Sequence, residues 1–71
     1  TTIDYILPQH AHVELSVYNL QGQKVATLVN NYQNQGAHSV LFDGSKLSSG
    51  IYLYELKTEN LCFIKKMTLI K

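Results

Sequence analysis

The most regular segment of this 71-residue chain is GIYLYELKT, residues 50–58. One face of an extended chain would carry Tyr52, Tyr54 and Leu56. The opposite face would carry Ile51, Leu53 and Glu55. A period of two residues is typical of a β-strand. Glu59 and Asn60 follow as a turn, and the apolar-rich residues 61–70 come next. The segment therefore predicts a C-terminal hairpin of two antiparallel strands.

The same alternation recurs upstream, at residues 2–7, 12–19 and 24–29, and in a fourth strand near residue 40. The faces expected to point inward carry Ile3, Tyr5 and Leu7, then Val13, Leu15 and Val17, then His38, Val40 and Phe42. Pro8 ends the first strand because it lacks an N–H donor. In residues 24–29, Val25 and Leu28 are three positions apart, so they would point to opposite faces of a regular strand. Either both faces of that strand are partly covered, or a β-bulge shifts its register.

Turn residues separate these strands at short intervals. Gly22 supplies a tight reversal, because glycine tolerates the positive φ that hairpin turns need. Residues 30–36 are polar and are expected to form a loop that exposes Tyr32. Residues 43–50 are expected to cross irregularly between sheets, with Leu47 holding the loop to the core. No stretch has a helical period. The fold expected is all-β, a small immunoglobulin-like antiparallel β-sandwich of six to seven strands.

Composition limits the chain to one folded domain. Seventy-one residues leave room for a single core, and 45% hydrophobic with 15% charged residues indicates a globular chain. The only cysteine, Cys62, cannot form an internal disulfide and is expected to act as a small buried hydrophobic residue. No apolar run approaches a membrane span. Residues 1–71 are interpreted as one domain, excised from a larger protein.

The sequence offers no convincing catalytic or metal centre. A triad could be drawn from Ser39, His38 and Asp43, but no strained turn presents the serine hydroxyl. His10 and His12 share a strand face, yet no cysteine or carboxylate completes a metal site with His38. We therefore expect no enzyme activity, no catalytic residue, no metal and no cofactor.

The basic C-terminal end and the tyrosines allow two readings each. Lys65, Lys66 and Lys71 lie beyond the last acidic residue, but three lysines without arginine make a weak nucleic-acid site. Charges that protect an edge strand from pairing are the simpler explanation, so no nucleic-acid partner is expected. Tyr52 and Tyr54 could stack on sugar rings. Large alternating residues in a sandwich strand more commonly form its core.

Several blocks occur in an order and spacing that resemble a known family. They are Thr2-Ile3-x-Tyr5-x-Leu7-Pro8, Val13-x-Leu15-x-Val17-Tyr18-Asn19-x-x-Gly22-x-x-Val25-x-x-Leu28, Gly36-x-His38-x-Val40-x-Phe42-Asp43-Gly44, Leu47-x-Ser49-Gly50-Ile51-Tyr52-x-Tyr54-x-Leu56 and Lys65-Lys66-Met67-x-Leu69-x-Lys71. Together they resemble the C-terminal sorting domain of cargo proteins exported by the type IX (Por) secretion system.

The resemblance implies a non-catalytic sorting signal. Such a domain would be recognised by the outer-membrane translocon after passage through the periplasm, and its parent protein would be secreted or held at the cell surface. The expected partners are the outer-membrane secretion machinery and the upstream domain of the parent. Residues of the family motif with an expected structural role are Gly22, Asp43, Gly44, Leu47, Gly50, Tyr52 and Tyr54.

The residues expected to contact the translocon are Lys65, Lys66, Met67, Leu69 and Lys71. Our hypothesis is that a receptor adds a strand to the last strand of the domain, with the lysines steering its approach. Exposed strand edges could also support a dimer. The alternative function is a carbohydrate-binding or adhesive module of a secreted enzyme, which would use Tyr32 and Tyr54. A purely structural spacer is a third possibility.

Overall fold

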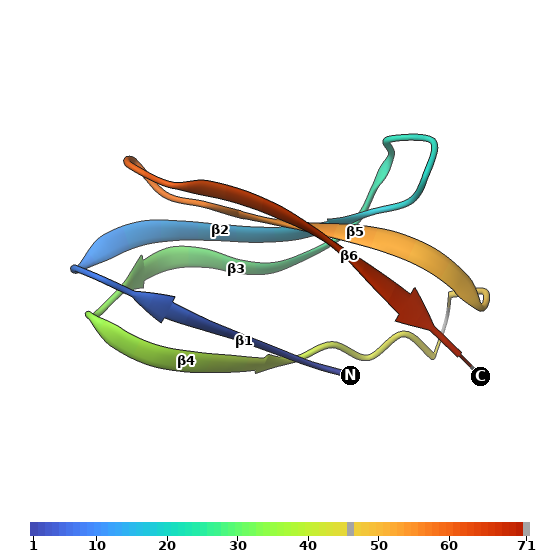
Figure 1. The fold of residues 1–71 in the computed structure, drawn as a ribbon, viewed down its shortest axis with the longest axis horizontal. Coiled ribbons are helices and arrows are strands. Elements are labelled where there is room, and N and C mark those ends of the chain that lie inside the picture. The colour runs from blue at the N-terminus through green and yellow to red at the C-terminus, as the bar shows by residue number, and fades with distance from the viewer. Residues whose placement is uncertain (46, 71) are drawn as a thin grey trace.

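The computed structural model describes residues 1–45 and 47–70, and all regular structure in them is β-strand. The strands are β1 (Thr2–Leu7), β2 (Ala11–Tyr18), β3 (Lys24–Gln33), β4 (Gly36–Leu41), β5 (Gly50–Lys57) and β6 (Cys62–Leu69). β1 pairs with β4, and a second sheet has the order β3-β2-β5-β6 (Figure 1). All pairings are antiparallel. The predicted small β-sandwich is confirmed.

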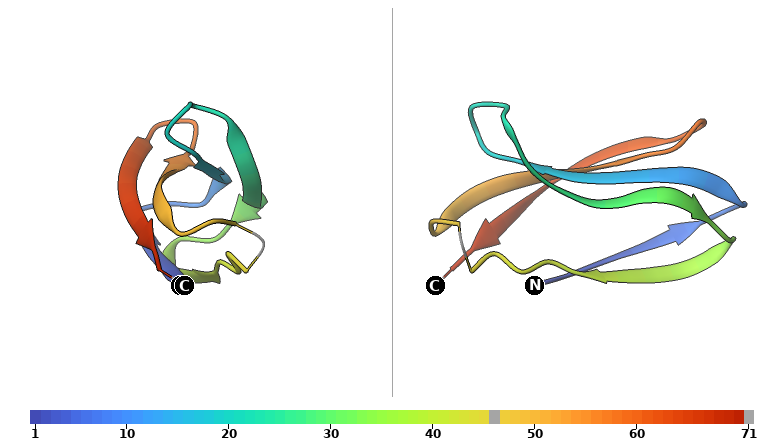
Figure 2. Two further views of the ribbon diagram at one scale, coloured as in Figure 1. Left: turned by 90° about the vertical axis from the view of Figure 1, so that its right-hand side faces the viewer. Right: turned by 180° about the vertical axis from the view of Figure 1, so that it is seen from behind.

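The strands of both sheets run along the long axis of the domain, and the core lies between the two stacked sheets (Figure 2). The side chains of Val13, Leu15 and Val17 on the central strand β2 are completely buried. The opposing layer contributes Ile3 and Leu7 from β1. From β5, Tyr52 and Leu56 complete the core, so the predicted inward faces of these strands are confirmed.

β3 is longer than predicted, and its register is irregular. The expected loop at residues 30–36 is wrong in its first half, because Asn30 to Gln33 continue the strand and pair with β2 as far as Ala11. Leu15 pairs with Val29 while Ser16 pairs with Thr27, which leaves Leu28 as an extra residue.

A second shift follows further along the same pair of strands. Val17 pairs with Ala26 and Tyr18 pairs with Lys24, so Val25 is also extra. Two β-bulges therefore explain the opposite parity of Val25 and Leu28, and the bulge alternative is the correct one.

One polar residue on the outer face of β2 is buried. Ser16 lies on the outer face of β2, opposite Thr27 and Glu55, but only 1% of it is exposed. β2 has a neighbour on each side, and a short side chain at the centre of a sheet lies below its longer neighbours. Its hydroxyl has no hydrogen-bond partner among the residues described.

The turn between β2 and β3 uses Gly22 as predicted. Gly22 has a φ of 84°, a conformation that favours glycine. Its N–H donates to the carbonyl of Asn19 at 3.0 Å. The side-chain oxygen of Asn19 accepts from the N–H groups of Gln21 and Gln23, both at 3.0 Å. The asparagine thus satisfies turn donors that would otherwise have only water as partner.

The contrast between core and surface leucines provides a test of the fold. Leu15 is 0% exposed and Leu41 is 76% exposed. Leu15→Ala should lower the free energy of unfolding by about 2–5 kcal/mol, because it removes buried methyl groups and leaves a cavity. Leu41→Ala is the matched control and should change it by less than about 0.5 kcal/mol. Urea unfolding of both variants measures the difference, and equal effects would contradict the proposed core.

Candidate recognition surface

β6 is an edge strand held by a tight hairpin. The N–H of Thr58 donates to the carbonyl of Leu61 at 2.8 Å. The Thr58 hydroxyl accepts from the N–H groups of Asn60 and Leu61, at 3.2 and 3.0 Å. β6 then pairs with β5 from Cys62 to Leu69, and the described residues give it no other neighbour in its sheet. Its second edge is therefore open to another strand.

The inward face of β6 is covered at one end only. Leu69 is 8% exposed and Met67 is partly buried against the core. Phe63, on the same face, is 51% exposed. The last part of β6 is therefore anchored in the domain, whereas its first part projects beyond the two-stranded sheet.

The two described lysines of β6 are exposed and point to opposite faces. Lys65 pairs with Tyr54 on the inward face, and Lys66 pairs with Leu53 on the outward face. An ion pair between described residues lies elsewhere, with 3.9 Å between Lys24 Nζ and Glu14 Oε2. Within residues 1–45 and 47–70, neither Lys65 nor Lys66 has an ion-pair partner. Lys71, also predicted to contact the translocon, lies outside the described residues.

Cys62 is exposed, so the prediction that it is a buried hydrophobic residue is wrong. It lies at the start of β6 opposite Lys57, on the outward face of the hairpin end, where no other layer packs. Its sulfur contacts the carboxylate of Glu55, with 3.6 Å between Sγ and Oε2.

The loop after β4 fixes the end of β6. A Cβ atom on Gly44 would lie 2.8 Å from Cδ2 of Leu69, so the loop backbone approaches closely because this residue has no side chain. The carboxylate of Asp43 accepts from the N–H of Ser45 at 3.0 Å, and the N–H of Leu47 donates to the Gly44 carbonyl at 2.9 Å. Leu47 packs on the core, as predicted.

The remaining residues of the family motif build β5. Gly50 begins the strand opposite Leu69. Tyr52 is buried and its hydroxyl donates to the carbonyl of Ser48 at 2.8 Å. Tyr54 is partly buried against the core. These positions make the motif a framework that places β6, and the interpretation of Tyr52 and Tyr54 as core residues is confirmed.

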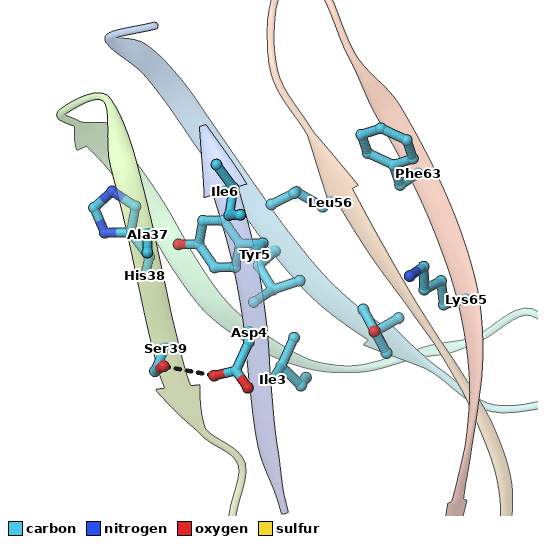
Figure 3. A pocket seen from close by; sticks show the side chains of 12 residues that line it. Ile3, Asp4, Tyr5, Ile6, Ala37, His38, Ser39, Leu56, Phe63 and Lys65 are labelled. Atoms are coloured by element: carbon cyan, nitrogen blue, oxygen red, sulfur yellow. Dashed lines mark hydrogen bonds between the residues drawn. The ribbon is translucent and has the colours of Figure 1, made fainter. Parts of the chain in front are cut away.

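An open groove of about 630 Å³ separates β1 from β6, and Figure 3 shows the side chains that line it. Ile3 and Tyr5 form one wall, and Phe63 and Lys65 form the other, with Leu56 between them. Burial raises the pKa of the Tyr5 phenol above 10.0, and its hydrogen bond with Gln33 partly offsets the rise. The groove was not predicted from the sequence, because alternation does not show how wide each sheet is.

The residues considered for catalysis and metal binding are not brought together. His38 faces inward and stacks on Tyr5, whereas Ser39 faces outward and its hydroxyl donates to the carboxylate of Asp4 at 2.5 Å. Neighbouring residues of one strand point to opposite faces, so they cannot form a nucleophile and base pair. In the described part of the chain, no three His, Cys, Asp or Glu side chains are grouped to hold a metal ion.

The aromatic residues suggested for sugar binding already contact other side chains of the domain. Tyr54 faces the core. Tyr32 is exposed, but the ring of His10 stacks on it at 5.4 Å and the ring of His12 approaches its edge at 5.1 Å. Two histidines thus occupy the surroundings of the one exposed tyrosine that the carbohydrate-binding alternative would use.

Comparison with known families gives one match over the whole chain. The family model described as secretion system C-terminal sorting domain matches residues 1–71. Neither the curated proteins nor the solved structures gave a match. The described residues include no helix that is long and apolar enough to cross a membrane. The family match does not favour the carbohydrate-binding alternative.

The close contact between Gly44 and Leu69 can be tested by a double-mutant cycle. Gly44→Ala should lower the free energy of unfolding by about 1–3 kcal/mol, because the new methyl group overlaps the Leu69 side chain. In a Leu69→Ala background the same change should cost less by at least about 0.5 kcal/mol, because the overlap is gone. Additive effects in urea unfolding would show that the loop does not position the end of β6 in this way.

Proposed function

The chain belongs to the family of secretion system C-terminal sorting domains, and on this premise we propose that β6 and its lysines are the part that the export machinery recognises. Membership makes the chain a C-terminal sorting signal of type IX secretion. It directs export across the outer membrane, to a secreted or cell-surface location. Interaction with the secretion machinery follows from the same membership.

The main-chain groups along β6 support recognition by strand addition. Residues 58 and 61 form a hydrogen-bonded pair, and such pairs alternate along an antiparallel ladder. The N–H and C=O groups of Ile64, Lys66 and Thr68 therefore point away from β5. An extended segment of the machinery can pair with them and extend the four-stranded sheet.

The lysines supply the electrostatic part of the recognition. Both Lys65 and Lys66 are exposed, and β6 contains no acidic residue, so this edge is a local concentration of positive charge. Carboxylates on the incoming segment would meet them on either face of the added strand. Such complementary charges mainly increase the rate and the specificity of association.

Met67 and Leu69 have a different role in this proposal. Their side chains pack on the domain, so they hold β6 in place and do not contact the receptor directly. Deleting the end of the chain would therefore unfold the edge as well as remove its charges. Substitution of the lysines is the sharper test.

We propose that the domain acts without chemistry of its own. The family is in general non-catalytic, and the separation of His38 from Ser39 on β4 agrees with a binding role. The machinery would recognise a folded surface, and the cargo would carry no active centre in this domain.

Reversal of the β6 charges tests the proposal. In a secreted reporter that ends with residues 1–71, Lys65→Glu with Lys66→Glu should reduce export about tenfold, equivalent to ~1.4 kcal/mol of binding. Lys24→Glu with Lys57→Glu, on β3 and at the end of β5, changes the net charge by the same amount without altering the free edge of β6, and should leave export within about twofold of the parent.

Reporter in the medium and in the periplasm is measured by immunoblot, and circular dichroism confirms that each variant is folded. Equal export of the two double variants would show that the position of the lysines is irrelevant, and the proposal would be wrong.

A further inference from the structure

The two-stranded sheet leaves half of the four-stranded sheet uncovered. β1 and β4 form one layer, and β1 has no neighbour on the side that faces the open groove. Beyond β1, the inward side chains of Tyr54 and Phe63 have no strand above them, and Figure 3 shows Phe63 on the far wall of the groove. Phe63 is exposed although it shares a face with the buried Leu69.

The wall of the groove formed by β1 has free main-chain groups. The N–H of Phe42 donates to the carbonyl of Thr1 at 2.7 Å, which makes residues 1 and 42 a hydrogen-bonded pair. In the alternating ladder with β4, the N–H and C=O groups of Thr2, Asp4 and Ile6 then point toward the groove. The natural complement of such an edge is another extended main chain.

We propose that the open groove receives an extended segment of the secretion machinery, which pairs with β1 as a third strand of the small sheet. The inference rests on the function proposed above and adds a second contact on the same open side. Adjacent strands lie about 4.8 Å apart and packed sheets about 10 Å apart, so this added strand would lie over Tyr54 and Phe63. It would bury both rings and complete the sandwich.

The groove also determines the chemistry of the segment. Apolar side chains of the added strand would point down onto Leu56 and Phe63, and alternate side chains would face solvent. Lys65 projects into the same space and has no acidic partner among the described residues. A carboxylate among the inward side chains of the segment would pair with it. The expected ligand is therefore an alternating apolar strand that carries an acidic residue.

A second copy of the domain fits this description poorly. Its open edge strand β6 brings two lysines and no acidic residue, so β6 of a copy would place like charges around Lys65. Antiparallel pairing of β1 with β1 through the free groups of Thr2, Asp4 and Ile6 is centred on Asp4, and it would place Asp4 opposite its own copy. Charge thus favours a segment from a different protein.

Phe63 and Ile51 form a matched pair for the test. They belong to the same sheet, are 51% and 41% exposed, and point to opposite faces. In the reporter, Phe63→Ser should reduce export about tenfold, because it removes an apolar contact inside the groove. Ile51→Ser should leave export unchanged. Equal export of both variants, with the fold intact by circular dichroism, would overturn the proposal.

The free edge of β1 is tested separately. Ile6 is exposed and its N–H points into the groove, so Ile6→Pro should keep the pairing with β4 while blocking an added strand. Export should fall about tenfold, whereas Ile6→Ala, which keeps the N–H group, should reduce export much less. Normal export of a folded Ile6→Pro variant would exclude pairing at this edge.

Photo-cross-linking identifies the protein that occupies the groove. It does not require the Phe63→Ser or the Ile6→Pro variant to fold normally. A benzoylphenylalanine placed at Phe63 should form an adduct with a component of the outer-membrane secretion machinery, identified by mass spectrometry. An adduct only with a second copy, or only with the cargo's own chain, would overturn the proposal. If charge reversal at Lys65 and Lys66 reduces export but the groove variants do not, the proposed function stands and this inference fails.

Discussion

A two-stranded sheet cannot cover a four-stranded sheet, and the surface of this domain depends on that mismatch. β2 lies between β3 and β5 and beneath the small sheet, so Val13, Leu15 and Val17 are fully buried. β6 lies at the far edge, where coverage ends. One core therefore stabilises the domain and at the same time leaves an apolar, basic side open. Both the open groove and the free edge of β6 follow from the unequal width of the layers.

A recognition strand must be accessible and still keep its shape. β6 meets both requirements because its two ends lie in different environments. Leu69 is held under the loop that contains Gly44, and the hairpin turn at Thr58 fixes the other end. Between these points the strand is held by its hydrogen bonds to β5 and by Met67, which packs on the core. Most residues of the family motif build this support, and few of them contact solvent where a receptor could bind.

The sequence predicted which way side chains point better than how deeply they are buried. Alternation with a period of two assigns faces correctly on β1, β2 and β5, because pleating alone determines them. Alternation cannot show that Phe63 is exposed and Leu69 is buried, because the two residues share a face and exposure depends on what lies opposite. Cys62 was predicted to be buried for the same reason.

The burial of Ser16 on β2 and the unexpected length of β3 have a related origin in strand pairing. Ser16 is buried because β2 is central, and the polar end of β3 is a strand because β2 offers it a partner as far as Ala11. Pairing overrides the weak strand preference of asparagine and glutamine. The sequence did not decide between a β-bulge in β3 and a strand covered on both faces. Only the cross-strand register distinguishes the two, and it shows two bulges.

The lysines of β6 can protect its free edge from pairing with other copies and can also attract the proposed partner. A long free edge with exposed apolar residues such as Ile64 would pair with other chains unless something prevented it. Lys65 and Lys66 are consecutive, so one charge lies on each face, and a second β6 approaching from either side meets a like charge. A segment that carries carboxylates meets attraction at the same positions. Two adjacent lysines can thus reject copies of the domain and favour an acidic partner, because specificity depends on the difference between the two affinities.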